Sequence, residues 1–320
     1  MIFSNSCDNF FDLAGGFSGD NSSGGNYVKV TLTWSEAAKE MQNFVSRISN
    51  YAKTARDEDQ IIINPDFIII PQNGVELAFN NTNRRDGILP SYVNAIDGIG
   101  VEELFYNDKG RQVNDNDLLD MLNILKGNKK IMVSDYVLND AAYNDSIEKN
   151  YDRGFIAFPR TSQNYGYKFI PDKEIQNENS KNIDKLSDAQ NYLYMIGASN
   201  INAIAETNYD VVLIDMFNNG RELQPSDLAK IRYKKNGGRR LLISYINVGS
   251  AENFRYYWKN DLPYLVKPYP GYPEEYYVAF WQKDWQDVIF GSSSSYIHKI
   301  LKAGFDGAYL DNVEAYKYIF

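Results

Sequence analysis

Residues 209–217, "YDVVLIDMF", decide the fold class. They form a short, continuous apolar run that ends at Asp215, and such runs are typical of strands buried on both faces of a sheet. Residues 225–238 follow with the pattern of a helix that has proline near its start and glycine at its end. Another buried-strand pattern, "RRLLISYINVG" (239–249), comes next. Strand, helix and strand in this order indicate an α/β fold with parallel strands.

The same alternation of apolar runs and amphipathic segments extends through most of the chain. Helices are predicted at 35–56, 115–126 and 295–304, and Thr33 with Glu36 resembles a capping box before the first of them. The predicted strands are 66–72, 96–101, 129–136, 192–197, 209–216, 239–248, 276–281 and 305–311. Eight parallel strands predict a (β/α)8 TIM barrel, and an open doubly wound sheet is the alternative.

The chain divides into a short leading segment and one large domain. Residues 1–30 are rich in Gly, Ser and Asn and are expected to be flexible, whereas residues 31–320 are expected to form the single barrel domain. "GFIAFP" (154–159) reads as a further short strand or extended segment, and the polar stretch 160–188 reads as a connecting loop.

Composition excludes several classes of function. The net charge of -9 makes nucleic acid an unfavourable partner and favours a neutral or cationic ligand. No apolar run is long enough to span a membrane. The single histidine, His298, is expected on a helix surface, and the single cysteine, Cys7, is read as an ordinary N-terminal residue rather than a lipidation site. Histidine-dependent triads and His/Cys zinc sites are therefore disfavoured, and we expect chemistry by carboxylates without a cofactor or metal.

Acidic residues collect at the predicted carboxyl ends of the strands, where the function of a parallel barrel resides. Asp215, Glu252 and Asp311 are the candidate catalytic residues, because two carboxyl groups of different pKa suffice to cleave a glycosidic bond. The candidate substrate-binding residues are Asn73, Asp135, Tyr136, Tyr245, Arg255, Trp281, Asn312 and Glu314. A purely structural role is the alternative for each acid. Asp215, for example, could form an ion pair with Arg221, and Glu252 could form one with Arg255, three residues further along a helix.

Residues 254–285 form a second signal, because twelve of these thirty-two positions are aromatic, against 14% in the whole chain. Several lie beside prolines, in a segment where a compact core is less natural. Aromatic faces suit sugar rings, although the same residues are also expected to pack over the top of the barrel.

At these segments the sequence resembles glycoside hydrolase family 114, the predicted endo-α-1,4-polygalactosaminidases. The resemblance is carried by "YDVVLIDMF", "LLISYINVGSAENFRYYW", "YYVAFWQKDWQDVI" and "KAGFDGAYLDNVEAYKY". It implies a barrel glycosidase that uses Asp215, Glu252 and Asp311, with Asn73, Asp135 and Glu314 as support. In the family the "PQNGVEL" segment follows the "YLDNVEAY" segment, whereas here it comes first. This order predicts a circular permutation, with 160–188 as the former junction of the termini.

Three functions remain open at this point. The first is hydrolysis of a polysaccharide, with one that contains α-1,4-linked galactosamine as the candidate substrate, Glu252 as general acid and Asp311 or Asp215 as nucleophile or base. The second is a barrel that binds carbohydrate without turnover, and the third is a hydrolase assisted by Mg²⁺ or Ca²⁺. We expect a monomer that acts outside the cell, in the periplasm or at the cell surface. The sugar, the linkage, retention or inversion, and the assignment of acid and base stay undetermined.

Overall fold

The computed structural model describes residues 27–161, 164, 166–197, 199–259 and 261–320. The predicted flexible segment lies outside this range except for residues 27–30, and so does Cys7. In that short described part, the amide nitrogen of Val28 donates to the carbonyl oxygen of Leu265 at 2.7 Å. No helix of the described chain is both long enough and apolar enough to cross a membrane.

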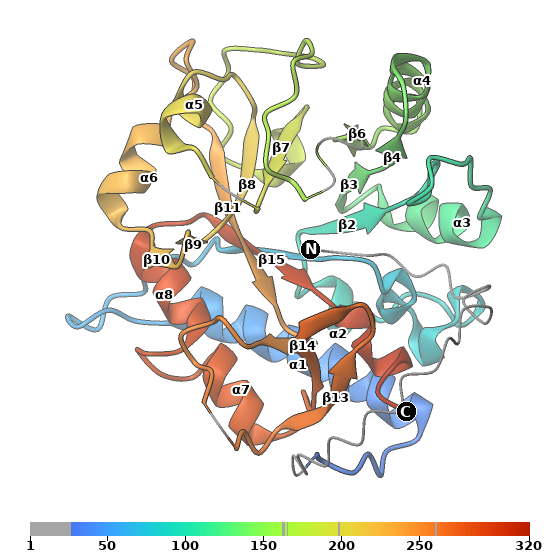
Figure 1. Ribbon diagram of the computed structural model, residues 1–320, viewed down its shortest axis with the longest axis vertical. Coiled ribbons are helices and arrows are strands. Elements are labelled where there is room, and N and C mark those ends of the chain that lie inside the picture. Colours follow the sequence, from blue (N-terminus) through green and yellow to red (C-terminus); the bar gives the residue numbers. More distant parts are fainter. Residues whose placement is uncertain (1–26, 162–163, 165, 198, 260) are drawn as a thin grey trace.

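A five-stranded parallel sheet forms the centre of the molecule (Figure 1). Its strands, in spatial order, are β1 (Ile68–Pro71), β15 (Gly307–Asp311), β11 (Leu241–Asn247), β8 (Val211–Asp215) and β7 (Tyr192–Met195). Every neighbouring pair is parallel, and every residue of these strands is buried. The α/β prediction is therefore confirmed, because continuous apolar strands need cover on both faces.

A second parallel sheet continues the first on the side of β1. It contains β2 (Gly98–Glu102), β3 (Lys130–Ser134) and β5 (Ile156–Ala157). A parallel bridge between Gln72 and Gly100 joins the two sheets, and the amide of Asn73 donates to the carbonyl of Gly100 at 2.8 Å. The carboxyl ends of all eight strands consequently lie on one side of the molecule.

The outermost strands, β5 and β7, meet through side chains. Within the described residues no β-ladder joins them, but the Tyr192 hydroxyl donates to the carbonyl oxygen of Val133 at 2.7 Å. The ring of Phe158 also lies 5.8 Å from that of Tyr192.

Tyr309 fills the space beside Gly100, where a Cβ atom would lie 1.9 Å from the Tyr309 hydroxyl oxygen, so only glycine fits there.

The predicted barrel strand at 276–281 is wrong. β14 (Tyr272–Val278) is instead the middle strand of a small antiparallel sheet, between β12 (Ser250–Glu252) and β13 (Leu265–Tyr269). It is only partly buried, with Pro273 and Glu274 exposed, because "YPEEYYV" carries polar residues, whereas a parallel central strand has to be apolar on both faces. The eighth parallel strand is β5, in the segment that the sequence left as a short strand or extended chain.

Helices surround the parallel strands. The long helix α1 (Trp34–Thr54) begins with the predicted capping box of Thr33 and Glu36. It packs against α8 (Tyr296–Ala303) and η6 (Val313–Lys317), near the other end of the chain. The other α-helices are α2 (Pro90–Val93), α3 (Asn116–Leu125), α4 (Asp140–Tyr151), α5 (Ile201–Ala205), α6 (Pro225–Ile231), α7 (Lys283–Ile289) and α8 (Tyr296–Ala303). The helix expected at 225–238 ends early, because Tyr233 and Arg239 form an antiparallel bridge around the turn at 235–238.

Short elements complete the connections between strands and helices. They are β4 (Tyr136–Val137), β6 (Arg160–Thr161), β9 (Phe217–Asn218), β10 (Arg221–Glu222), η1 (Val75–Ala78), η2 (Asn80–Thr82), η3 (Arg84–Asp86), η5 (Leu186–Asp188) and η6 (Val313–Lys317). The described part of the predicted loop 160–188 contains β6 and η5 and is otherwise irregular. It is anchored by a buried ion pair, since Lys234 bonds both to Asp210 at 2.7 Å and to the carbonyl of Asn179.

Candidate functional site

Two cavities open at the carboxyl ends of the parallel strands. Cavity 1 has a volume of about 490 Å³ and lies beyond β7, β8 and β11. Cavity 2 has a volume of about 700 Å³ and lies beyond β1, β2 and β15. The candidate residues that line cavity 1 are Asp215, Tyr245, Glu252, Arg255 and Glu275. Those that line cavity 2 are Asn73, Glu102 and Glu314.

Arg255 brings two of the predicted catalytic residues together in the wall of cavity 1. Its two terminal nitrogens donate to the two carboxylate oxygens of Asp215 at 3.0 and 2.8 Å, and its Nε donates to Glu252 Oε2 at 2.6 Å. All three side chains are buried. Burial raises the pKa of the Asp215 carboxyl, and the Arg255 charge opposes that rise. The ion pair of Glu252 with Arg255, expected as a structural alternative, thus forms inside the candidate site.

Asp311 lies at the end of β15, behind the wall of cavity 1. Its Oδ2 accepts a hydrogen bond of 2.5 Å from the Tyr245 hydroxyl, and the Tyr245 side chain lines the cavity. Its Oδ1 accepts from the amide of Asn312 at 2.8 Å. Burial raises the pKa of Asp311 to about 7, although the Tyr245 hydrogen bond opposes the rise. Asp311 is therefore connected to cavity 1 through Tyr245.

Glu275 is a site residue that the sequence reasoning missed. It projects from β14 into cavity 1, and its Oε1 accepts hydrogen bonds from Asn247 Nδ2 at 2.8 Å, from Asn312 Nδ2 at 3.2 Å and from the Ser250 hydroxyl. Burial, together with the charge of nearby Glu252, raises the pKa of Glu275 to about 8. The available signal was the pair of adjacent glutamates in "PEEYYV", and Glu274 and Glu275 both line cavity 1.

Asn73 and Glu314 meet in cavity 2 rather than cavity 1. Asn73 Nδ2 donates to Glu314 Oε1 at 3.2 Å, and Asn73 Oδ1 accepts from the amide of Glu102 at 3.0 Å. Burial raises the pKa of Glu314 to about 8, and the negative charge of Asp311 adds to this effect. Cavity 2 is therefore lined by acidic residues and lies close to Asp311, the last residue of β15.

Glu102 is a second acid that the sequence reasoning missed, although it ends a predicted strand. Its Oε1 accepts from Arg160 at 2.8 Å and from the Tyr167 hydroxyl at 2.5 Å. The Arg160 guanidinium lies over the rings of Tyr136 and Tyr167, 3.5 and 3.9 Å from their centroids. Tyr136 thus supports Arg160 and contributes to neither cavity. The charge of Glu102 also contributes to the raised pKa of Asp311.

Two other predicted residues lie away from both cavities. Asp135 is fully buried and accepts hydrogen bonds from the amides of Phe105 and Tyr106 at 2.8 and 3.2 Å and from Ser146 Oγ at 2.7 Å. It therefore anchors the loop after β2 and helix α4, which is the structural alternative for an acid at a strand end. Trp281 packs edge-on against Phe280, with ring centroids 5.1 Å apart, and lines neither cavity.

Most aromatic side chains of 254–285 pack against one another. Trp285 is fully buried and contacts Tyr264 at 5.0 Å and Tyr257 at 5.5 Å between ring centroids. Phe254 and Tyr256 differ, because they are 64% and 43% exposed and line cavity 1. The two expectations for this segment are therefore met by different residues: most form packing, whereas Phe254, Tyr256 and the buried Tyr272 line cavity 1.

The described part of the chain contains no group of three or more His, Cys, Asp or Glu side chains placed to hold a metal ion. His298 is half-buried on α8, and its Nδ1 lies 3.0 Å from the Tyr51 hydroxyl. It lines a different cavity, beside residues 56–63 and α8.

Comparison with known proteins links part of this α/β chain to carbohydrate enzymes. Residues 173–318 match the model of glycoside-hydrolase family GH114. This range contains Asp215, Glu252, Glu275, Asp311 and Glu314 and excludes the cavity 2 residues Asn73 and Glu102. That part of the chain is therefore similar to a family of glycoside hydrolases.

Three curated proteins are similar to part of this chain. An uncharacterized protein of Methanocaldococcus jannaschii is 34% identical over 148 residues, which cover 44% of this chain and 41% of that protein. An uncharacterized protein of Thermotoga maritima is 28% identical over 133 residues, or 40% of each chain, and one of Deinococcus radiodurans is 29% identical over 126 residues, or 38% of each. The chain thus spans about two-fifths of the length of these relatives. No solved structure matches the chain.

Proposed function

We propose that the protein is a glycoside hydrolase that cleaves a polysaccharide in cavity 1. The observation that carries this proposal is the meeting of Asp215 and Glu252, from different strands, on one arginine in the wall of a cavity. Carboxyl groups with raised pKa values, Asp311 and Glu275, lie around the same wall. A pair of carboxyl groups in opposite protonation states is what glycosidic cleavage requires.

The contacts of Arg255 favour a different role for Glu252 from the one expected from sequence. Hydrogen bonds donated by a guanidinium favour the charged carboxylate. We therefore assign Glu252 or Asp215 to the nucleophile or base rather than Glu252 to the general acid. Asp311 orients Tyr245 in the cavity wall, because its carboxyl group accepts the Tyr245 hydrogen bond.

The proposed substrate is a polymer of neutral or positively charged sugars, with α-1,4-linked galactosamine as the first candidate. The net charge of -9 and the acids of both cavities favour a cationic amino sugar. Exposed Phe254 and Tyr256 supply apolar faces for sugar rings at cavity 1. A substrate of this kind also leads us to propose action outside the cytoplasm, which cell fractionation tests.

The test is release of reducing ends from α-1,4-galactosaminan by the wild type, Glu252→Gln and Asp311→Asn. We expect turnover by the wild type and a loss of at least about a hundredfold in kcat/KM for Glu252→Gln, because a nucleophile or general base is removed. Folding of each variant is checked by circular dichroism. Unchanged turnover in both variants would refute the assignment of the site.

A carbohydrate-binding protein without turnover is the second candidate. One observation favours it: Arg255 bonds to both Asp215 and Glu252, so neither carboxylate is free of an ion pair. This function predicts that galactosaminan oligomers bind to the wild type and are recovered uncleaved after long incubation. The hydrolase predicts products under the same conditions.

We also propose that the two parallel sheets form one closed (β/α)8 barrel. The bridge of Gln72 with Gly100 on one side supports this, as do the contacts of Tyr192 with Val133 and Phe158 on the other. Closure predicts slow hydrogen exchange of the backbone amides of β5 and β7. Exchange of both strands as fast as in an exposed loop would contradict a closed barrel.

The circular permutation remains a proposal too. The family match begins at residue 173, within the connecting segment 160–188, and β1 pairs directly with β15. A variant that begins at residue 173, links residue 320 to residue 27 and ends at residue 172 restores the family order and keeps Tyr167, which lines cavity 1 and bonds to Glu102. We expect it to fold and to retain the activity of the wild type. An unfolded product would count against the permutation.

A further inference from the structure

The two carboxyl oxygens of Glu275 differ: one faces cavity 1, and the other accepts hydrogen bonds from neighbouring side chains. Oε1 accepts hydrogen bonds from Asn247, Ser250 and Asn312, which come from β11, β12 and the turn after β15. Three donors from three segments fix the carboxyl group in one orientation. Oε2 accepts no hydrogen bond from the described residues. It is nevertheless not among the fully buried side-chain oxygen atoms that lack a hydrogen-bond partner. Because Glu275 lines cavity 1, Oε2 is the atom that faces the cavity.

We propose that Glu275 is the catalytic proton donor of the hydrolysis in cavity 1. This inference rests on the proposed function and adds the residue that protonates the leaving group. Asp215 and Glu252 line the same cavity and are both bound by Arg255, so they are poorly suited to release a proton. Glu275 has no arginine or lysine partner among the described residues and carries its free oxygen on the cavity side.

Glu275 Oε2 transfers its proton to the glycosidic oxygen while the bond from that oxygen to the anomeric carbon breaks, and the leaving sugar departs as an alcohol. Water supplies the hydroxyl group for the anomeric carbon, directly or after attack by a carboxylate. The remaining proton of that water returns to Glu275, or it passes through the base carboxylate to solvent and Glu275 takes up a proton from solvent. No oxidant or metal is needed for these reaction steps.

The surroundings of Glu275 keep its proton in place near neutral pH. Burial raises its pKa to about 8, and the negative charges of Glu252 on β12 and Asp311 on β15 act in the same direction. The phenols that face it are those of Tyr245, Tyr269 and Tyr277, which are all buried or half-buried. The nearby cation, Arg255, is bound to Asp215 and Glu252. A carboxyl group in such a setting is protonated when substrate binds.

The test compares two substrates that differ in their need for acid assistance. Glycosidic bonds between sugars need a proton on the leaving oxygen, whereas a dinitrophenyl glycoside of galactosamine has a leaving group that departs as an anion. We expect Glu275→Gln to lower kcat/KM on α-1,4-galactosaminan by about 10²–10⁴-fold and to change cleavage of the dinitrophenyl glycoside by less than about tenfold. Gln keeps the size of Glu and retains an acceptor for the three donors at Oε1.

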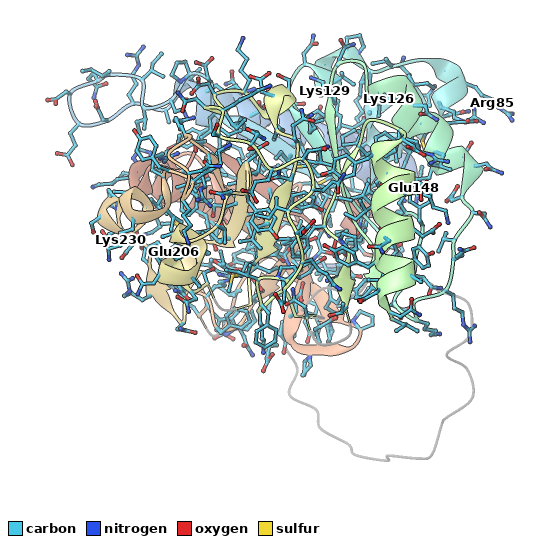
Figure 2. All side chains as sticks on the ribbon, turned by 90° about the horizontal axis from the view of Figure 1, so that it is seen from above. Arg85, Lys126, Lys129, Glu148, Glu206 and Lys230 are labelled. Atoms are coloured by element: carbon cyan, nitrogen blue, oxygen red, sulfur yellow. The ribbon has the colours of Figure 1, made fainter. Side chains whose placement is uncertain are left out.

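The matched control is Glu148→Gln, the same chemical change on the outer helix α4, where the side chain is exposed (Figure 2). This substitution should leave kcat/KM unchanged on both substrates. Equal losses on both substrates in Glu275→Gln, or no loss on the polysaccharide, would overturn the role of Glu275 while leaving the hydrolase proposal intact. A wild type that cleaves neither substrate would overturn the proposed function, and this inference with it.

A second measurement covers the case in which Glu275→Gln does not fold. The wild-type kcat/KM on galactosaminan should fall on the alkaline side with an apparent pKa of about 8, as the proton of Glu275 is lost. The dinitrophenyl glycoside should lack this alkaline fall, because its leaving group needs no proton. An alkaline fall of the same midpoint for both substrates would contradict the proposal.

Discussion

Asn73 and Glu314 stand 241 positions apart in the chain, yet the Asn73 side-chain amide donates a hydrogen bond of 3.2 Å to Glu314 Oε1. They meet because each follows the end of a strand, Asn73 after β1 and Glu314 after β15, and these two strands are parallel neighbours. The pairing joins the first parallel strand of the chain to the last. It therefore makes cavity 2 sensitive to changes at either end of the sequence.

Substitution of Asn73 should separate a side-chain effect from a backbone effect. Asn73 has a positive φ of 59°, and its side chain bonds to Glu314 and to the amide of Glu102. Asn73→Gly removes the hydrogen bonds, each of which contributes about 0.5–1.5 kcal/mol. Asn73→Ala should lower the free energy of unfolding by about 1 kcal/mol more, because left-handed backbone disfavours a Cβ atom. Urea unfolding measures both, and equal stability of the two variants would show that the backbone is unstrained.

Arg255 should not be replaceable by lysine. Lysine supplies one point charge, whereas Arg255 bonds to Asp215 through two nitrogens and to Glu252 through a third. We expect Arg255→Lys to lower the free energy of unfolding by about 1–3 kcal/mol and kcat/KM by at least about tenfold. The control is Arg84→Lys, whose partner Asp117 is largely exposed, where the change in stability should be much smaller. Similar effects at both positions would contradict the special role of Arg255.

Glu314 should make stability depend on pH. Its pKa is raised from 4.5 to about 8 in the folded protein, so between these values the folded state holds a proton that the unfolded state has lost. Stability from this group is therefore fully present below about pH 4.5 and falls as the pH rises towards 8, by up to about 1.4 kcal/mol per pH unit. Glu314→Gln should reduce this slope. Urea unfolding at several pH values between 5 and 8 measures it, and an unaltered slope would refute the shift.

Asp135 should prove structural despite its position at a strand end. It accepts hydrogen bonds from two backbone amides and from Ser146, and it lies outside both cavities. Asp135→Ala leaves these donors unsatisfied and should lower the free energy of unfolding by about 1–3 kcal/mol. The activity per folded molecule should stay unchanged, because no atom of Asp135 lines cavity 1. A lower kcat in a fully folded Asp135→Ala variant would show that Asp135 contributes to the site.

Much of the fold could be predicted because its signals are local. Apolar runs such as 209–217 and 239–249 form strands wherever both faces are buried, and the spacing in α1 gives one apolar face. The prediction for 276–281 is wrong because its aromatic residues resemble a buried strand, although Glu274 and Glu275 just before them are unlike the apolar residues of a central parallel strand. Residues that end parallel strands share one side of a sheet, so Asp215 and Asp311 could also be predicted as neighbours of the site.

The parallel α/β architecture and the gathering of acids at one side follow from the chain's local patterns, since strand and helix periodicity depend on neighbouring residues. How those acids are used depends on long-range contacts: Asp215 and Glu252 share Arg255, Asp135 anchors a loop, and Glu275 lines cavity 1. The physical reason is that burial, ion pairing and hydrogen bonding join segments far apart in the chain. Their energies depend on distances of a few ångströms that no local pattern encodes.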